Sequence, residues 1–418
     1  MGASRPDLEE SLKEGAHSAT TSRRRHRVRS VLVASELALA LVLLIGAGLL
    51  IRSFRALISV DPGFQPGRVL AFSLNLTGSR YAQPQARAAF YDQLQTQLRA
   101  LPGVESTAIT DSLPLTGFTT MLLGLQVEGR PPAMPGQDPV ISQVVVSPEF
   151  FHVLGMTLVD GRAFNDHDAE HAERVAIINQ NLARHFFPNQ NAVGKRLKFG
   201  PSGDQWTTIV GEVGDVRHGG LDTDAGPEIY VPMAQLEARE FAYVAMRTHG
   251  DPGLLAPAVR SEVGAIDKDQ PIYDLETLDQ KLATSLAARR FNMLLLGLFA
   301  TLALALAAVG IYSVTSFTVT QRTHEIGVRM ALGATGRNVI KMVVGETLLM
   351  TLVGIGGGLV AAAALSRLLA SMLFGIHATD PATFAGVSLL LAAVALMATY
   401  VPARRATEVD PLVALRYE

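Results

Sequence analysis

The densest group of side chains that could bind a metal or move a proton lies between residues 165 and 171. It comprises Asn165, Asp166, His167, Asp168, Glu170 and His171. His167 and His171 are four residues apart, so on a helix both imidazoles would lie on one face, as a zinc site requires. A solvated loop following Phe164 explains the same composition without a metal. We favour the loop and predict no metal site.

The sequence lacks the residue patterns that nucleotide binding, serine hydrolysis and cysteine chemistry need. The nearest fragment to the phosphate loop G-x-x-x-x-G-K-[ST] is Gly194-Lys195-Arg196, which lacks both the upstream glycine and the hydroxyl residue. No serine lies in a G-x-S-x-G elbow. The chain has no cysteine, which removes thiol catalysis, disulfides and thiolate metal ligands. We therefore predict no catalytic residue, no bound cofactor and no enzymatic activity.

Two carboxylates, Glu36 and Glu346, lie inside long apolar segments. Each is about seven residues from the basic end of its segment, or ~10 Å deep at the rise of a helix. An ionisable residue inside a membrane helix is a functional candidate, as a proton relay or a contact between helices. The alternative, which we favour, is that both lie near the interface and extend toward Arg29, Arg337 or Lys341.

The segment RTHEIGVRMALGATGRNV at 322–339 predicts a short amphipathic helix. Glu325 and Arg329 form an i,i+4 pair in the favourable order. Gly333 and Gly336 are expected to stop the helix. Its apolar faces contain Ile326, Val328, Met330 and Leu332, followed by Val339. Such a helix between two membrane spans can transmit force from a cytosolic partner, or it can simply lie on the lipid headgroups.

The elements that position these residues are four apolar blocks. The blocks are Val31–Ile51, Met293–Tyr312, Thr347–Leu365 and Phe384–Val401. As a helix, each is close to the ~30 Å thickness of the hydrocarbon core of a bilayer. Apolar residues make up 48% of the chain and charged residues 18%, below the roughly 25% typical of soluble domains. These blocks predict four transmembrane helices.

Basic residues at the ends of the blocks predict the orientation. The arginines and lysines concerned are Arg23, Arg24, Arg25, Arg27 and Arg29 before the first block, Arg322, Arg329, Arg337 and Lys341 around the loop between the second and third, and Arg404, Arg405 and Arg416 after the fourth. The positive-inside rule puts both termini and this loop in the cytoplasm. The first block is longer than the apolar region of a signal peptide, so we expect a retained anchor.

The long segment between the first two blocks predicts a mixed α/β domain. Strands are expected at 69–76, 104–110, 122–127, 141–146, 175–178, 197–199, 207–216, 229–231 and 243–247, and helices at 83–100, 180–187, 252–266 and 275–288. Ser147-Pro148-Glu149 is expected to open a further short helix with Ser147 as its cap. The predicted fold is therefore an α-helical membrane protein with four transmembrane helices and a large mixed α/β extracytoplasmic domain between helices 1 and 2.

At the 322–339 segment the chain resembles the MacB/FtsX-like family of ABC transporter permeases. The similarity rests on THEIGVRMALGA, on GETLL in the third block and on the terminal VPARRATEVDPLVALRYE, with PGF at 62–64 and LPGVEST at 101–107. It implies residues 1–30 as a cytoplasmic basic tail, 31–51 as transmembrane helix 1 and 52–290 as a periplasmic MacB-like core domain. Residues 291–418 would form an FtsX-like permease domain with helices at about 293–313, 341–365 and 384–402.

The resemblance also implies partners and a site. The ATPase-coupling residues would be Arg322, Thr323, His324, Glu325, Ile326, Gly327, Arg329 and Gly333. A separate cytoplasmic ABC ATPase would use the ATP and move the periplasmic domain by mechanotransmission, for export or efflux across a bacterial inner membrane. A second permease copy or half, membrane lipid and a periplasmic adaptor are the other expected partners. The net charge of −2 gives no sign of nucleic-acid binding.

Two alternatives stay open. MacB-type transporters carry an ATPase ahead of the first span, whereas about 30 residues precede it here, and PDLEESLKEG at 6–15 resembles the linker of duplicated permeases. The chain is therefore expected to be either a stand-alone subunit or one half of a longer permease. The alternative function is an FtsX-like signal transmitter that regulates an extracytoplasmic hydrolase without moving a substrate.

Overall fold

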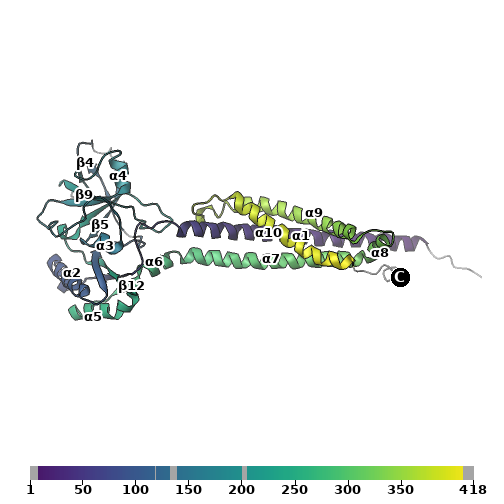
Figure 1. Ribbon diagram of the computed structural model, residues 1–418, viewed down its shortest axis with the longest axis horizontal. Helices are drawn as coiled ribbons and strands as arrows, with labels where there is room; N and C mark the ends of the chain where they lie inside the picture. The colour runs from purple at the N-terminus through teal and green to yellow at the C-terminus, as the bar shows by residue number, and fades with distance from the viewer. Residues whose placement is uncertain (1–7, 118, 132–138, 200–204, 408–418) are drawn as a thin grey trace, which may run out of the picture. The chain divides into compact units, whose positions relative to one another are not determined.

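The computed structural model describes residues 8–117, 119–131, 139–199 and 205–407. The predicted motif at the end of the chain extends beyond these residues from 408 onward. The chain divides into two compact units, one formed by Ser59–Ala288 and the other by Met1–Ile58 together with Arg289–Glu418. We call them the outer unit and the membrane unit and describe each by itself (Figure 1).

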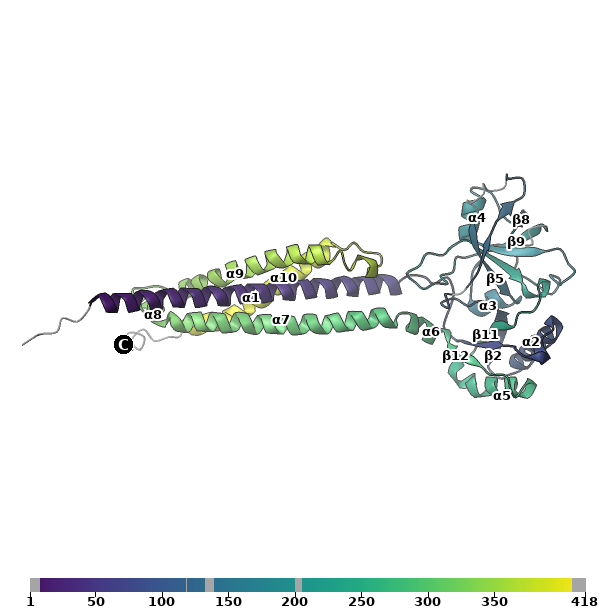
Figure 2. The same ribbon diagram turned by 180° about the vertical axis from the view of Figure 1, so that it is seen from behind.

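Long apolar helices build the membrane unit, and in both views they run side by side (Figures 1 and 2). They are α1 (Leu8–Ile58), α7 (Ala287–Gln321), α9 (Gly336–Leu365) and α10 (Pro381–Thr407), with the short α8 (Thr323–Ala331) between α7 and α9. Each long helix contains a stretch apolar and long enough to cross a membrane. The predicted four transmembrane helices are confirmed, and each helix extends beyond its apolar block.

In the membrane unit α9 packs closely against α1, and two glycines of α9 allow this approach. A Cβ atom added at Gly354 would lie 2.9 Å from the Cβ of Leu37, and one added at Gly358 would lie 3.0 Å from the backbone of Ala38. Glycines spaced by four residues let two helix backbones approach closely, which maximises dispersion contacts in lipid. This face of α9 therefore packs against α1 of the same chain.

The membrane unit contains a proline inside a helix. Pro402 lies in α10, one turn before Ala406, and both side chains are buried. Because proline has no backbone N–H, it cannot donate the hydrogen bond that a helix residue normally gives to the carbonyl four residues earlier. The last turn of α10 is therefore held to the rest of that helix by one backbone hydrogen bond fewer.

A single mixed sheet forms the outer unit. In the described residues it has twelve strands in the order β12-β1-β11-β2-β5-β10-β7-β9-β8-β4, with β3 beside β5 and β6 beside β9. The strands are β1 (Val69–Asn75), β2 (Val104–Thr110), β3 (Thr120–Leu123), β4 (Gln126–Val127), β5 (Val140–Val146), β6 (Leu158–Gly161), β7 (Val175–Asn179), β8 (Arg196–Lys198), β9 (Thr207–Val213), β10 (Glu228–Pro232), β11 (Phe241–Thr248) and β12 (Tyr273–Thr277).

Helices cover both faces of this sheet. They are α2 (Pro84–Arg99), α3 (Phe150–Leu154), α4 (Gln180–Phe186), α5 (Ala256–Ile266) and α6 (Leu278–Ser285). Helices α2 and α5 lie beside β2 and β11 (Figure 2). The apolar cluster formed by these helices with β1, β2 and β11 includes Phe72 and Phe90. Another lies beneath α3 and α6, and a third beneath α4. The predicted mixed α/β architecture is confirmed, because apolar side chains recur at helical spacing in α2 and fill the core.

Several local predictions were wrong. The segment expected as one helix at 275–288 begins as strand β12, and α6 starts only at Leu278. The side chains of Thr277 and Gln280 form a capping box there, which fixes the start of the helix. Ser147 does not cap α3. Its hydroxyl instead accepts a hydrogen bond from the backbone N–H of Ile109, at 3.0 Å.

Two strand predictions also changed. The strand expected at 122–127 is split into β3 and β4 at Gly124, whose φ of +82° breaks the extended conformation. Strand β6 has no counterpart in the prediction. Its residues are all exposed, so the alternation of buried and exposed residues that marks a strand is missing from its sequence.

The α1–α9 contact gives a prediction for Gly358. The variant Gly358→Ala places a methyl group against the Ala38 backbone, and overpacking of this kind costs about 1–3 kcal/mol. The apparent melting temperature of the purified full chain in detergent should fall. Gly357→Ala is the matched control, because a Cβ there meets no atom within 4 Å. Equal melting temperatures for the two variants would contradict the close packing of α1 against α9.

Candidate coupling site

The amphipathic helix predicted from 322–339 is α8. Thr323 begins it, and the Thr323 hydroxyl donates to the carbonyl of Thr320 at 2.9 Å. At its other end Gly333 has a φ of +97°, while the N–H of Ala334 donates to the carbonyl of Arg329 and the N–H of Gly333 to that of Met330. This is a Schellman motif, so Gly333 ends the helix as predicted. Gly336 does not, because it is the first residue of α9.

One face of α8 is buried against the ends of three long helices. Ile326 is 1% exposed and packs with Val339 of α9 and Ala406 of α10. Val319 of α7, Met330 and Met342 complete this cluster. Gly327 is also buried. Any displacement of α8 therefore pushes on α7, α9 and α10 together, because close-packed apolar groups leave little free volume.

The other face of α8 is exposed and charged. His324, Glu325 and Arg329 lie on it, and Arg329 Nη2 is 2.6 Å from Glu325 Oε1. The predicted i,i+4 pair is thus formed. Leu332, at the end of the helix, is 83% exposed. The set of coupling residues inferred from the sequence omits Leu332. Leu332 lies off the helical stripe formed by the buried Ile326 and the partly buried Met330, and this spacing was the signal that could have placed it on the exposed face.

Glu346 lies beside the start of α8. Its Oε1 atom is 2.6 Å from Nη1 of Arg322, the residue between α7 and α8. The expected partners Arg337 and Lys341 were wrong for a geometric reason. Lys341 is five residues from Glu346, which turns it about 140° away around a helix with 3.6 residues per turn. Arg322 reaches this carboxylate from the junction between α7 and α8.

Glu36 has a different environment. A Cβ atom added at Gly310 of α7 would lie 2.6 Å from Glu36 Oε2, so this glycine makes room for the carboxylate. In the described part of the chain no ion pair joins Glu36 to Arg29, the partner we expected. The Arg29 guanidinium instead lies over the ring of Phe317, 4.2 Å from its centroid.

A cavity of about 240 Å³ lies between α1, α7 and α9, next to α8. Its lining is mainly apolar, with Leu37 from α1 and Ile311 from α7 among its walls. Arg322 and Glu346 both line it. The hydroxyls of Thr315 on α7 and Thr347 on α9 are 3.4 Å apart at its wall. Helices α7 and α9 are thus in contact at Thr315 and Thr347, and the cavity separates them elsewhere.

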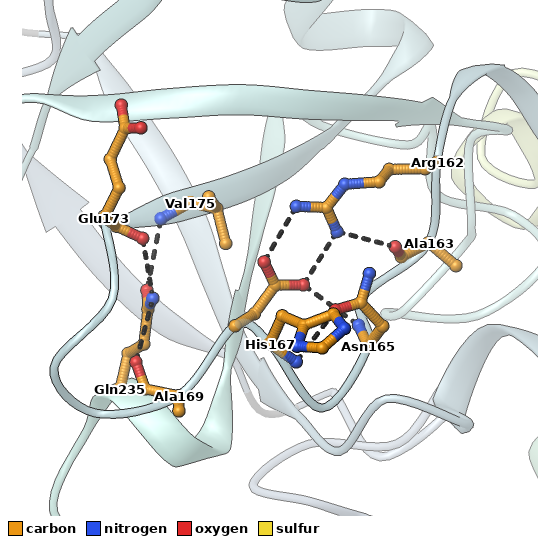
Figure 3. A network of polar contacts seen from close by, with 9 residues as sticks. Arg162, Ala163, Asn165, His167, Ala169, Glu173, Val175 and Gln235 are labelled. Atoms are coloured by element: carbon orange, nitrogen blue, oxygen red, sulfur yellow. Dashed lines mark hydrogen bonds and ion pairs between the residues drawn. The ribbon is translucent and has the colours of Figure 1, made fainter.

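The 165–171 segment is a loop and not a helix, so the spacing of His167 and His171 does not bring their imidazoles onto one helix face. Asp168, 5% exposed, accepts two hydrogen bonds from the Arg162 guanidinium, both 2.8 Å, and a third from the backbone N–H of Asn165 (Figure 3). These hydrogen bonds lower the pKa of Asp168, with the Arg162 side chain as the largest cause. In the described residues no cluster of three potential ligands could hold a metal ion.

Two family models match this chain. The MacB-like periplasmic core domain matches residues 30–264, and the FtsX-like permease C-terminal domain matches residues 297–411. The first covers more than half of the chain. The chain belongs to the MacB/FtsX-like family of ABC transporter permeases. It is therefore a multi-pass membrane protein, and its outer unit corresponds to the family's periplasmic core.

Curated relatives agree with this assignment. The macrolide export ATP-binding/permease protein MacB of Chromobacterium violaceum is 27% identical over 299 residues, covering 66% of this chain and 43% of that protein. The pyoverdine export ATP-binding/permease protein PvdT of Pseudomonas putida is 28% identical over 287 residues, covering 64% of this chain and 42% of that protein. The chain thus spans less than half the length of these relatives.

Parts of the chain are similar to two solved structures. The periplasmic region of MacB from Actinobacillus actinomycetemcomitans has a TM-score of 0.36 at 15% identity, covering 55% of this chain and 97% of that one. The extracellular domain of the ABC-type transporter YknZ from Gram-positive bacteria has a TM-score of 0.33 at 15% identity, covering 48% and 93%. The family assignment rests on the family models.

The Asp168 loop gives a prediction for pH dependence. Because the folded-state pKa of Asp168 is lowered, its ion pair stabilises the outer unit above the unfolded-state pKa of about 3.9 and is lost as pH falls through the lower folded-state pKa. Asp168→Asn should therefore cost about 1–3 kcal/mol at neutral pH and remove part of the destabilisation below pH ~4.

Fluorescence of Trp206, the single tryptophan of the chain, reports unfolding of the outer unit in the full chain. Asp166→Asn is the control, because Asp166 lies on the exposed side of the same loop. If Asp168→Asn and Asp166→Asn gave the same stability from pH 3 to pH 7, the buried ion pair would contribute nothing.

Proposed function

We propose that this chain is the transmembrane permease part of an ABC-type transporter, with α8 as the helix that receives force from a separate cytoplasmic ATPase. The observation that carries the proposal is the two-sidedness of α8. Its inner face packs against the ends of α7, α9 and α10, and its outer face presents Glu325, Arg329 and the exposed Leu332. ATP would be bound and hydrolysed by the partner, since the chain has no phosphate loop.

The coupling residues divide into two groups by position. His324, Glu325 and Arg329 are exposed and are proposed to contact the ATPase directly. Ile326 is buried and would act by transferring displacement of α8 to the long helices. Arg322 and Thr323 connect α7 to α8, while Gly327 is buried and Gly333 ends the helix. In this proposal the chain transmits force mechanically, and the movement of the transmembrane helices reaches the outer unit.

The proposed direction of transport is export. MacB of Chromobacterium violaceum and PvdT of Pseudomonas putida are export proteins by name, and both combine an ATP-binding part with a permease part. We extend the direction to this chain and infer a second permease copy or half, an adaptor on the periplasmic side and an inner-membrane location. An FtsX-like transmitter remains the competing function. ATPase stimulated by a small exported compound in proteoliposomes supports export, whereas stimulation only by a periplasmic protein supports signalling.

The exposed face of α8 gives a prediction for ATPase binding. Glu325→Ala/Arg329→Ala removes two charges from that face and should lower the amount of co-purified ABC ATPase about tenfold, equivalent to roughly 1.4 kcal/mol of binding free energy. The measurement is affinity purification of the tagged full chain from native membranes. Glu262→Ala/Lys268→Ala, which removes one acidic and one basic residue from the outer unit, should leave the yield unchanged. Equal ATPase yields from both double variants would contradict the coupling role.

The proposed orientation has both termini and α8 in the cytoplasm, supported by the arginines and lysines at the helix ends. The cysteine-free sequence allows a direct measurement. In intact spheroplasts, a membrane-impermeant maleimide should label Lys268→Cys in the outer unit. It should label Ala334→Cys, next to α8, only after the membrane is permeabilised. Labelling of Ala334→Cys in intact spheroplasts would reverse the topology.

A further inference from the structure

We propose that Arg322 and Glu346 form a latch between the coupling helix and α9, and that Glu346 is a positioning residue for force transfer. The latch holds the cytoplasmic end of α7 against α9 beside the cavity described above. The inference rests on the proposed function of α8, but its test does not require the ATPase.

Arg322 connects α7 to α8. It lies between the last residue of α7, Gln321, and the first residue of α8, Thr323. Its backbone N–H still donates to the carbonyls of Thr318 and Val319, both at 3.1 Å, so the residue continues the hydrogen bonding of α7. A movement of α8 therefore moves the Arg322 guanidinium, and with it the ion pair to Glu346.

The pair is a charge-assisted hydrogen bond between side chains that are 37% and 50% exposed, and it joins α9 to the α7–α8 junction. Glu346 follows a run of apolar residues in α9, where an unpaired carboxylate is costly. A charge-assisted hydrogen bond of 2.6 Å to Arg322 satisfies it. The Glu325–Arg329 pair has the same 2.6 Å separation, but it joins two residues of one helix. Of these two pairs, only Arg322–Glu346 ties one helix to another.

The packing on the two sides of α9 differs. On one side of α9, Gly354 and Gly358 bring the helix into backbone contact with α1. On the other side, α9 and α7 are separated by the cavity and touch through the hydroxyls of Thr315 and Thr347. We infer that α9 moves as a pair with α1, and that α7 is the helix free to shift into or away from the cavity. The Arg322–Glu346 latch sets the distance between α7 and α9.

The test uses disulfide formation across this gap. Thr315→Cys/Thr347→Cys in the otherwise cysteine-free full chain places one thiol on each helix at the observed contact. Copper–phenanthroline oxidation in membranes then measures how often α7 and α9 meet. Adding Glu346→Gln or Arg322→Gln should slow the cross-linking about threefold or more, because the helix ends are no longer tied.

Two further variants separate a latch from a general loss of stability. The charge swap Arg322→Glu/Glu346→Arg should restore the cross-linking rate to within about twofold of the parent, since the attraction is re-formed. Arg52→Gln, which removes the ion pair between Arg52 of α1 and Asp380 at the other end of the spans, should leave the rate unchanged. The proposal is overturned if Glu346→Gln and Arg322→Gln cross-link at the parent rate, or if the swap remains as slow as the single variants.

The outcome is independent of the proposed function. Absence of an ABC ATPase from the purified complex would refute the coupling role of α8 while a positive cross-linking result still stood. A negative cross-linking result would remove the latch and leave ATPase binding to α8 intact.

Discussion

The backbone contact between α1 and α9 is the constraint on which the membrane unit depends. Helices inside a bilayer are already out of water, so packing their apolar side chains together brings no further hydrophobic stabilisation. They associate instead through dispersion contacts, which need close approach. Gly354 and Gly358 supply that approach, and the side chains of Leu37 and Leu41 fit over them. With these two helices fixed to each other, α10 packs on α9 while one side of α7 borders a cavity. The unit thus combines a rigid pair with a less tightly held helix.

Several polar side chains in this unit lie where helices meet or end. Glu346 is tied to Arg322, Glu36 fits against Gly310, and the hydroxyl of Thr315 meets that of Thr347. At the other end of the spans, the Ser53 hydroxyl accepts a hydrogen bond from the N–H of Phe374 at 2.7 Å. The hydrogen bonds of Glu346, Thr315 and Ser53 satisfy polar groups that lipid would not solvate, and each joins residues distant in sequence.

Structure that depends on residue spacing within one segment could be predicted from the sequence, whereas contacts between residues distant in sequence could not. The four apolar blocks, the core face of α2 and the Glu325–Arg329 pair all follow from spacing within one segment. The start of α6 depended on a capping box at Thr277, which the continuous helical pattern concealed. The partner of Glu346 depended on how α7 folds back against α9, and no spacing within α9 reveals Arg322. The exposed strand β6 lacks the alternating pattern altogether.

Pro402 has a consequence for how α10 responds to α8. The hydrogen bond missing at this residue separates the part of α10 that spans the membrane from the final turn that carries Ala406. Bending at such a point is cheaper than bending a regular helix. The final turn of α10 can therefore follow a movement of α8 without tilting the rest of the helix.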